Sequence, residues 1–422
     1  MISSMPPRKI AFISSFLPRR CGIATFTSDL IKNVRSAAGM DFSPSVVAMQ
    51  SRNEHQYTTP VEFVLRRDVA SDYTDAADYL NSKNVDAVSL QHEFGLFGGA
   101  GGSYLGLLLK CLEAPVVTTL HTVLDRPSPE YFNCLAGVCD KSQRIVVMNK
   151  RGVGMLTDIY GVPERKISLI PHGIPDISFS RTGSCKRGLS RPGRKVILTF
   201  GLISRNKGLE VMLRAMPAIV KAHPEALYIV LGTTHPEVIK NEVYSYRNEL
   251  FQIIDELRLQ NHVVFHDKFV SDLELREFLC ASDIYVTPYL HREQLTSGTL
   301  AFAVGAGKAI VSTPYWAAEE LLAQGRGKLV PFGNPERTAS AIIELLDNDS
   351  LLNQLQLRAY EYGRAMTWPK VGRAYWDLLA RELQFELTTT TTIAPLRDSR
   401  IRRFQPAISV AAGADSSMSL MG

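Results

Sequence analysis

The sequence has 422 residues, of which 45% are hydrophobic and 21% are charged. This length predicts two or three domains with ample core, and the ordinary composition excludes a chain that is disordered throughout. The net charge of +5 comes from basic residues that are not clustered, which argues against nucleic acid as a partner and leaves a weak attraction to anionic lipids or nucleotides open.

The cysteine pattern and the hydrophobic segments indicate a cytoplasmic protein. The six cysteines form no CxxC pair and no zinc-finger spacing with histidine, so reduced thiols are the simplest interpretation. They are Cys21, Cys111, Cys134, Cys139, Cys185 and Cys280. The first residues lack an apolar signal core, and no stretch approaches the roughly 18 apolar residues that span a bilayer. Membrane contact, if any, is therefore expected to be peripheral.

In the first half, short apolar runs alternate with helical patterns, which predicts a parallel sheet with helices on both faces. The runs span residues 9–14, 45–49, 87–91, 116–121, 144–148 and 167–170. The loop after the first run contains Gly22, which either serves a tight turn or lets the backbone lie close to a substrate.

Two of these runs end in polar side chains, where ligands bind in such sheets. His92 and Glu93 follow one run, but an adjacent pair without a third ligand is more typical of a hydrogen-bonded strand end than of a metal site. His121 is the better site candidate, because it stands at a strand end and not inside an apolar face.

A second alternating series follows a break at Pro171-His172-Gly173-Ile174-Pro175 and a stretch rich in Gly, Ser, Lys and Arg. Its predicted strands span residues 196–201, 227–232, 263–266, 284–287, 309–313 and 328–330, and its helices 209–223, 246–259, 272–279 and 335–346. The predicted fold class is α/β, with two doubly wound Rossmann-like domains facing across a cleft.

The predicted domains are residues 1–180 and 195–367, joined by a linker at 181–194. A helix at 368–386 is predicted to pack back on the first domain, and 387–422 is predicted to be a flexible tail.

The stretch from Asp283 to Thr313 predicts a strand, a polar loop, a helix beginning around Ser297-Gly298-Thr299, and a second strand. The uncovered N–H groups at such a helix start favour an anion. Most strand-to-helix turns are plain connections, but here Gly201 begins a second loop, with Arg205 and Lys207, at the same carboxyl edge. Two cations and a helix N-terminus suit a diphosphate.

Several motifs together resemble a known family. They are Pro-x-x-Cys-Gly22-Ile-Ala-Thr, Leu-His121-Thr, Pro-His172-Gly-Ile-Pro, Phe-Gly201-Leu-Ile-Ser-Arg205-Asn-Lys207-Gly208, Glu293-Gln294 to Thr299, Gly307-Lys-Ala-Ile-Val-Ser-Thr and Trp368-Pro. In this order they resemble the family 4 (group 1) retaining glycosyltransferases of the GT-B fold, in the mannosyltransferase-like branch. The resemblance spans roughly Lys9 to Phe385.

The resemblance implies that the first domain binds the acceptor and the second a nucleotide-diphosphate sugar. Lys207 matches the family's lysine that neutralises the diphosphate. Arg205 is assigned the arginine role, although Leu202 occupies the usual position. The second glutamate of the Glu-x7-Glu motif is absent, because Ala301 and Phe302 stand where counting from Glu293 or Gln294 would place it.

The implied reaction moves a hexose, mannose or glucose, to a saccharide or lipid-linked acceptor in polysaccharide or glycoconjugate synthesis. GDP-mannose is the favoured donor, no cofactor or metal is expected, and the leaving phosphate takes the acceptor's proton, so no nucleophilic carboxylate is required. The predicted catalytic residues are His121, Arg205, Lys207 and Glu293. The predicted donor- and substrate-binding residues are Gly22, His92, Glu93, His172, Gly201, Gly232, Gln294, Ser297, Gly298 and Thr299.

Two apparent motifs are rejected. Gly307-Lys308 resembles the end of a Walker A loop, but Ala309 replaces the hydroxyl residue that would hold magnesium. Asp347-Asn-Asp349 resembles the Asp-x-Asp motif of metal-dependent transferases, but it ends an amphipathic helix and is interpreted as a surface turn. Other functions stay open: an epimerase or sugar phosphorylase of the same fold, or a non-catalytic sugar-nucleotide-binding protein or scaffold.

Overall fold

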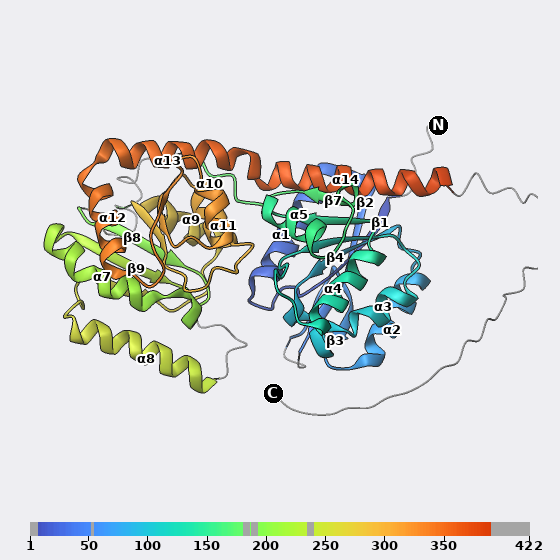
Figure 1. The fold of residues 1–422 in the computed structure, drawn as a ribbon. Helices are drawn as coiled ribbons and strands as arrows, with labels where there is room; N and C mark the ends of the chain where they lie inside the picture. Colours follow the sequence, from blue (N-terminus) through green and yellow to red (C-terminus); the bar gives the residue numbers. More distant parts are fainter. Residues whose placement is uncertain (1–6, 52–54, 180–185, 187–192, 234–239, 390–422) are drawn as a thin grey trace, which may run out of the picture. The chain divides into compact units, whose positions relative to one another are not determined.

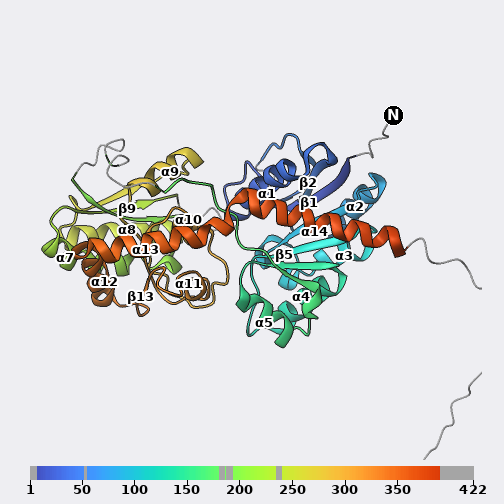
Figure 2. The ribbon, with the colours of Figure 1, turned by 90° about the horizontal axis from the view of Figure 1, so that it is seen from above.

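The computed structural model describes residues 7–51, 55–179, 186, 193–233 and 240–389, and for 240–245 and 384–389 only the backbone path. Residues Met1–Leu383 form one compact unit and Gln384–Gly422 a second, of which only the end of one helix is described. Within the first unit, two parallel sheets with helices on both faces are confirmed, as the sequence predicts (Figures 1 and 2).

The first sheet has seven parallel strands in the order β3-β2-β1-β4-β5-β6-β7. They are β1 (Arg8–Ser14), β2 (Phe42–Gln50), β3 (Val61–Arg66), β4 (Ala87–His92), β5 (Val116–Leu120), β6 (Arg144–Val147) and β7 (Ile167–Leu169). The helices are α1 (Gly22–Ala38), α2 (Ala70–Ser82), α3 (Leu105–Cys111), α4 (Pro129–Lys141) and α5 (Lys150–Asp158). The central strands β1, β4 and β5 are buried over most or all of their length because both faces of the sheet are covered.

The second sheet has six parallel strands in the order β10-β9-β8-β11-β12-β13. They are β8 (Lys195–Phe200), β9 (Ala226–Leu231), β10 (Val263–His266), β11 (Ile284–Thr287), β12 (Ala309–Ser312) and β13 (Lys328–Leu329). The helices are α7 (Leu209–Ala222), α8 (Lys240–Glu256), α9 (Asp272–Ala281), α10 (Gly298–Gly305), α11 (Trp316–Leu321), α12 (Pro335–Asp347) and α13 (Asp349–Gly363). Clusters of buried side chains lie on each face: α7, α8 and α12 on one, α9, α10 and α11 on the other.

The last helix, α14 (Trp368–Thr389), packs on the same face of the first sheet as α1 (Figure 2). Trp368, Val371 and Tyr375 share a buried cluster with Phe12 of β1, and the Tyr375 hydroxyl lies 3.0 Å from Thr119 Oγ1. The proposed domain boundaries stay a prediction. The proposed linker, except for Lys186, Gly193 and Arg194, and the proposed tail from residue 390 lie outside the described residues.

Two expectations need correction. Strand β3 was not predicted: it is an edge strand in which half-buried or buried residues alternate with exposed ones, so it forms no continuous apolar run. The prediction of reduced cysteines holds for Cys21, Cys111, Cys134 and Cys139 but is wrong for Cys280, which is disulfide-bonded. Cys185 lies outside the described residues. Among the described residues, no helix combines the length and the apolar character needed to cross a membrane.

Candidate active site

A cavity of about 970 Å³ lies at the carboxyl ends of strands from both sheets. Ser15 follows β1, Glu93 follows β4, His121 follows β5, Gly201 follows β8 and Gly232 follows β9, and all of them line it. The structure also brings most of the other predicted site residues to this wall. These are Gly22, His172, Lys207, Glu293, Gln294, Gly298 and Thr299.

Three predicted residues are described but are not part of the wall: His92, Arg205 and Ser297. Ser297 contributes indirectly, because its hydroxyl caps α10: it accepts a hydrogen bond from the Leu300 N–H at 3.3 Å. Such a cap fixes where the helix begins.

The start of α10 faces the cavity through Gly298 and Thr299. No described residue accepts a hydrogen bond from their backbone N–H groups, as expected in the first turn of a helix. Gly298 has no room for a side chain, because a Cβ there would lie 2.9 Å from His172 Nε2. The helix therefore offers free N–H donors and its positive dipole end to the cavity.

The loop that carries Lys207 is held against the loop that precedes α10. Gly208 has a φ of +61°, and a Cβ on it would lie 2.1 Å from the Pro288 carbonyl oxygen. The Leu290 N–H donates to the Asn206 carbonyl at 3.0 Å. These contacts place the Lys207 side chain on the same wall as Thr299.

Next to this loop, two glycines expose their backbone to the cavity. Gly201 and Gly232 have φ values of +129° and +147°, which side chains rarely adopt. A Cβ on Gly232 would lie 1.9 Å from the Gly201 carbonyl oxygen, and one on Gly201 would lie 3.2 Å from Thr299 Cγ2. The strand ends thus approach each other closely and leave the space in front of them to a ligand.

The two predicted cations differ in their surroundings. Lys207 Nζ lies 3.9 Å from the ring centroid of Tyr289 and forms no ion pair with a described residue. Arg205 instead donates from Nη1 and Nη2 to both Glu249 carboxylate oxygens, each at 2.7 Å, and lies over the Tyr246 ring. The structure does not bring Arg205 to the cavity, because Glu249 neutralises it outside the wall.

Two histidines of the wall are held neutral by burial. Burial, with smaller contributions from His172 and His92, lowers the pKa of His121 to about 3, and burial lowers that of His172 to about 4. His121 Nε2 donates to Gln91 Oε1 at 3.1 Å, and His172 Nδ1 donates to the Gly173 carbonyl at 2.7 Å. At neutral pH, both rings can therefore contact hydroxyl groups but do not supply positive charge.

His92 and Glu93, at the end of β4, lie in different surroundings. His92 is fully buried between Phe94 and Phe97, and burial lowers its pKa to about 4. Glu93 lines the cavity and accepts hydrogen bonds from Thr122 Oγ1 at 2.6 Å and from the Phe94 N–H at 3.1 Å. Glu93 thus has the hydrogen bonds typical of a strand end, and His92 packs in the core.

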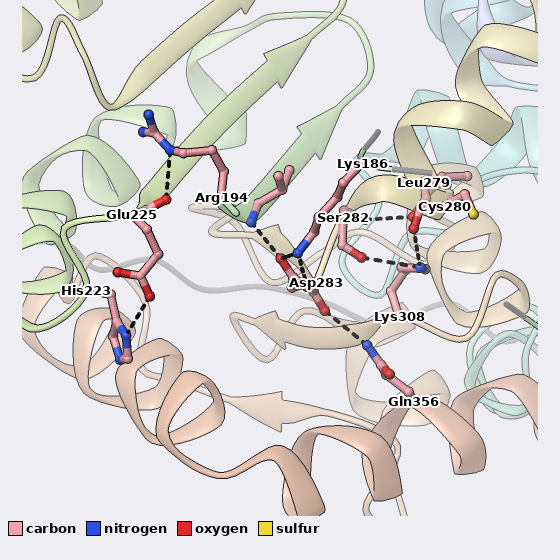
Figure 3. Close-up of polar contacts among 11 residues, drawn as sticks. Lys186, Arg194, His223, Glu225, Leu279, Cys280, Ser282, Asp283, Lys308 and Gln356 are labelled. Atoms are coloured by element: carbon pink, nitrogen blue, oxygen red, sulfur yellow. Dashed lines mark hydrogen bonds and ion pairs between the residues drawn. The ribbon is translucent and has the colours of Figure 1, made fainter. Parts of the chain in front are cut away.

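The rejected motifs lie away from the cavity. Lys308 is buried and donates to the carbonyl oxygens of Cys280 and Ser282 at 3.3 Å, near the ion pair of Lys186 with Asp283 (Figure 3). Asn348 caps α13 through the Leu351 N–H at 2.9 Å, which makes its two aspartate neighbours part of a helix–helix turn. Among the described residues, no three His, Cys, Asp or Glu side chains gather as metal ligands would.

Sequence reasoning missed many residues of the wall, among them Asp29, Tyr289 and Phe302. Asp29 repeats the helical spacing of Gly22 and Phe26 on α1, and burial, then Asp272, raises its pKa to about 6. Tyr289 follows β11 by two residues, so its position at a carboxyl strand end was the available signal. Phe302 occupies a position where the Glu-x7-Glu motif would have glutamate, and it contacts His172 at a centroid distance of 6.0 Å.

Comparison with known proteins agrees with this architecture. Residues 194–348 match the family model of glycosyl transferases group 1. Phosphatidyl-myo-inositol mannosyltransferase of Mycolicibacterium smegmatis is 27% identical over 215 residues, 51% of this chain and 50% of that protein. D-inositol 3-phosphate glycosyltransferase of Kineococcus radiotolerans is 22% identical over 306 residues, 64% of this chain and 67% of that protein. The match to the mannosyltransferase thus spans about half of that relative's length.

Solved structures show the same fold over most of the chain. The HepE protein of Anabaena in complex with UDP matches with a TM-score of 0.68 at 16% identity. The match covers 89% of this chain and all of the HepE chain. Sucrose-phosphate synthase of Thermosynechococcus elongatus matches with a TM-score of 0.71 at 15% identity. The match covers 91% of this chain and all of the synthase chain. The protein therefore has the GT-B fold. Within it, residues 194–348 are the part that matches the group 1 glycosyl transferase model.

Proposed function

We propose that the protein is a retaining glycosyltransferase that moves a hexose from a nucleotide-diphosphate sugar to a saccharide or lipid-linked acceptor. The observation that carries this proposal is the convergence of the Lys207 ammonium and the first N–H groups of α10 on one cavity, beside the bare backbone of Gly201 and Gly232. A diphosphate is the ligand that such a wall would take.

Breaking the bond between the anomeric carbon and the phosphate leaves negative charge on the diphosphate. Lys207 and the N–H groups of Gly298 and Thr299 are fixed before the reaction, so they would stabilise this charge without reorganisation. In a same-face mechanism, the departing phosphate oxygen takes the acceptor hydroxyl proton as the new glycosidic bond forms. The wall then has to position the two substrates and needs no nucleophile of its own.

The remaining wall residues are assigned to the two sugars. Glu293, Gln294 and His121 are proposed to bind hydroxyl groups of the donor hexose, since a carboxylate, an amide and a neutral imidazole suit hydroxyls. Gly22 and Asp29 of α1 would face the acceptor, because they line the cavity from the first half of the chain. Lys207 is the residue on which transfer depends most.

The proposed donor is GDP-mannose, supported by the mannosyltransferase names of the relatives. UDP-glucose is the specific competitor, because HepE structures contain UDP and UDP-glucose. A lipid-linked acceptor has support from the phosphatidyl-inositol relative, and peripheral membrane contact stays part of the proposal.

The direct test is turnover of GDP-mannose and UDP-glucose with a mixed acceptor panel, for the wild type, Lys207→Ala and Lys221→Ala. Lys221 is an exposed lysine of α7 and serves as the matched control. Wild type and Lys221→Ala should transfer sugar, and Lys207→Ala should lose about 100-fold or more in kcat/KM. Sugar turnover without an acceptor would indicate an epimerase, and cleavage that needs phosphate a phosphorylase. Nucleotide binding without turnover would indicate a non-catalytic binder.

A further inference from the structure

Tyr289 is a buried tyrosine with one edge in the cavity wall. It is 1% exposed, yet it lines the cavity. The Tyr315 ring stacks on it, with a centroid distance of 4.8 Å and an interplanar angle of 18°. Lys207 Nζ lies over the same ring at 3.9 Å from its centroid. Because Tyr315 occupies one face of the ring, the ammonium lies against the other.

An aromatic face holds a cation differently from a carboxylate. The ring quadrupole attracts the ammonium but carries no net charge, so the positive charge of Lys207 is oriented and not cancelled. Arg205 shows the other case in the same loop, since Glu249 binds both of its terminal nitrogens. Of these two basic side chains, only Lys207 keeps its charge available to an anion in the cavity.

The Tyr289 hydroxyl connects the cation to the helix start. It lies 3.1 Å from Thr299 Oγ1, which in turn lies 3.4 Å from the Ser297 hydroxyl that caps α10. Burial alone would raise the pKa of Tyr289, but the Lys207 ammonium and the hydrogen bonds of its hydroxyl outweigh burial and lower it. One side chain therefore contacts both parts of the candidate diphosphate site.

We propose that Tyr289 is a positioning residue that sets the Lys207 ammonium and the first turn of α10 as one rigid receptor for a diphosphate. This inference rests on the proposed function, because it names how that site selects the diphosphate group. Its ring fixes the ammonium, and its hydroxyl fixes Thr299. Tyr289 should therefore govern the preference for a diphosphate over a monophosphate.

The test compares Tyr289→Leu and Tyr289→Phe with the control Tyr375→Phe. Tyr375 of α14 is equally buried, its hydroxyl lies 3.0 Å from Thr119 Oγ1, and it is not part of the cavity wall. Calorimetry measures the affinities for UDP and UMP, or for GDP and GMP if GDP binds the wild type more tightly. The ratio of diphosphate to monophosphate affinity should fall at least tenfold in Tyr289→Leu and about threefold in Tyr289→Phe, and stay unchanged in Tyr375→Phe.

A merely structural role of Tyr289 would lower the melting temperature and leave this ratio unchanged, which overturns the inference. If Tyr289→Leu does not fold, the isosteric Tyr289→Phe variant decides: the wild-type ratio in that variant overturns it as well. The two proposals fail separately. A wild type that binds neither UDP nor GDP refutes the proposed function. Diphosphate binding that depends on Lys207 but not on Tyr289 refutes only this inference.

Discussion

Single residues determine which charges the cavity presents. Lys207 keeps its positive charge because its neighbour is a ring, and His121 and His172 are neutral because they are buried. Glu93 is tied by hydrogen bonds at the end of β4. A dianionic ligand at the start of α10 would thus meet the Lys207 ammonium and backbone N–H groups, beside the glycine backbone of Gly201 and Gly232.

Arg205 gives a prediction that distinguishes the observed ion pair with Glu249 from the diphosphate-binding role that the family resemblance implies. Arg205→Ala should change kcat/KM less than about threefold and cost less than about 1 kcal/mol of stability, because exposed ion pairs contribute little. Steady-state kinetics beside Glu249→Ala measure this. A loss of 100-fold in Arg205→Ala alone would show that Glu249 releases the guanidinium to the substrate, as the resemblance implies.

Asp29 predicts a pH-dependent difference in stability. Its pKa is raised from 3.8 to about 6, chiefly by burial and then by Asp272, so the folded state binds its proton more tightly than the unfolded state does. Stability present below about pH 4 is therefore lost as the pH rises through 6, by up to about 3 kcal/mol.

Asp29→Asn lacks this titration, so its stability relative to the wild type should rise between pH 4 and pH 7 and then level off. Urea unfolding of both proteins across this range measures the difference. Parallel pH profiles would contradict the assigned shift.

At the scale of elements, the sequence predicted what depends on local pattern. Apolar runs located the strands of both sheets except β3, whose edge position leaves only a weak alternating signal. The position of the site followed from the topology, because parallel strands bring their carboxyl ends to one edge. The glycines and polar residues at those ends were found for this reason.

What the sequence could not show are contacts between segments that lie far apart. Nothing in the basic loop indicates that Glu249 pairs with Arg205 while the ring of Tyr289 faces Lys207. Glu249 and Tyr289 lie tens of residues away from Arg205 and Lys207 in the sequence. Their choice depends on how α8 and the β11–α10 loop pack, which local periodicity does not encode.

Helix α14 gives a prediction in which the usual sign of a substitution reverses. Glycine to alanine in a helix normally stabilises by about 0.5–1 kcal/mol, as expected for Gly137→Ala in α4, where an added Cβ meets nothing within 4 Å. A Cβ on Gly372 would lie 2.5 Å from the Asn33 carbonyl carbon of α1. Gly372→Ala should therefore destabilise by about 1–3 kcal/mol. Denaturant unfolding of both variants tests the packing of α14 on α1, and two stabilised variants would refute it.

For the whole molecule, the wall assigned to the diphosphate lies in the second half of the chain, and the wall assigned to the acceptor lies in the first half. Contacts between α5 and α11 connect the halves: the Lys150 N–H lies 2.9 and 3.2 Å from the two Glu320 carboxylate oxygens, and Arg151 forms a 2.9 Å ion pair with Glu319. Binding of the nucleotide and transfer to the acceptor should therefore be separable.

Glu320→Ala tests this separation. Nucleotide affinity should stay within about twofold of the wild type, because Lys207, Gly298 and Thr299 are untouched, while acceptor-dependent kcat/KM should fall. Removing the partner of a helix-start N–H should also cost about 1 kcal/mol of stability. Calorimetry and kinetics on the same preparation give both values. An equal loss in both would mean that the halves form a single binding unit for the donor.

The central claim is that Lys207 and the start of α10 form a receptor for a nucleoside diphosphate. Isothermal calorimetry of the wild type and Lys207→Ala with UDP, GDP and ADP measures it without assuming an acceptor. The account predicts that the wild type binds at least one of the three and that Lys207→Ala weakens this binding at least tenfold, about 1.4 kcal/mol. Equal binding by both proteins, or no binding by the wild type, would contradict it.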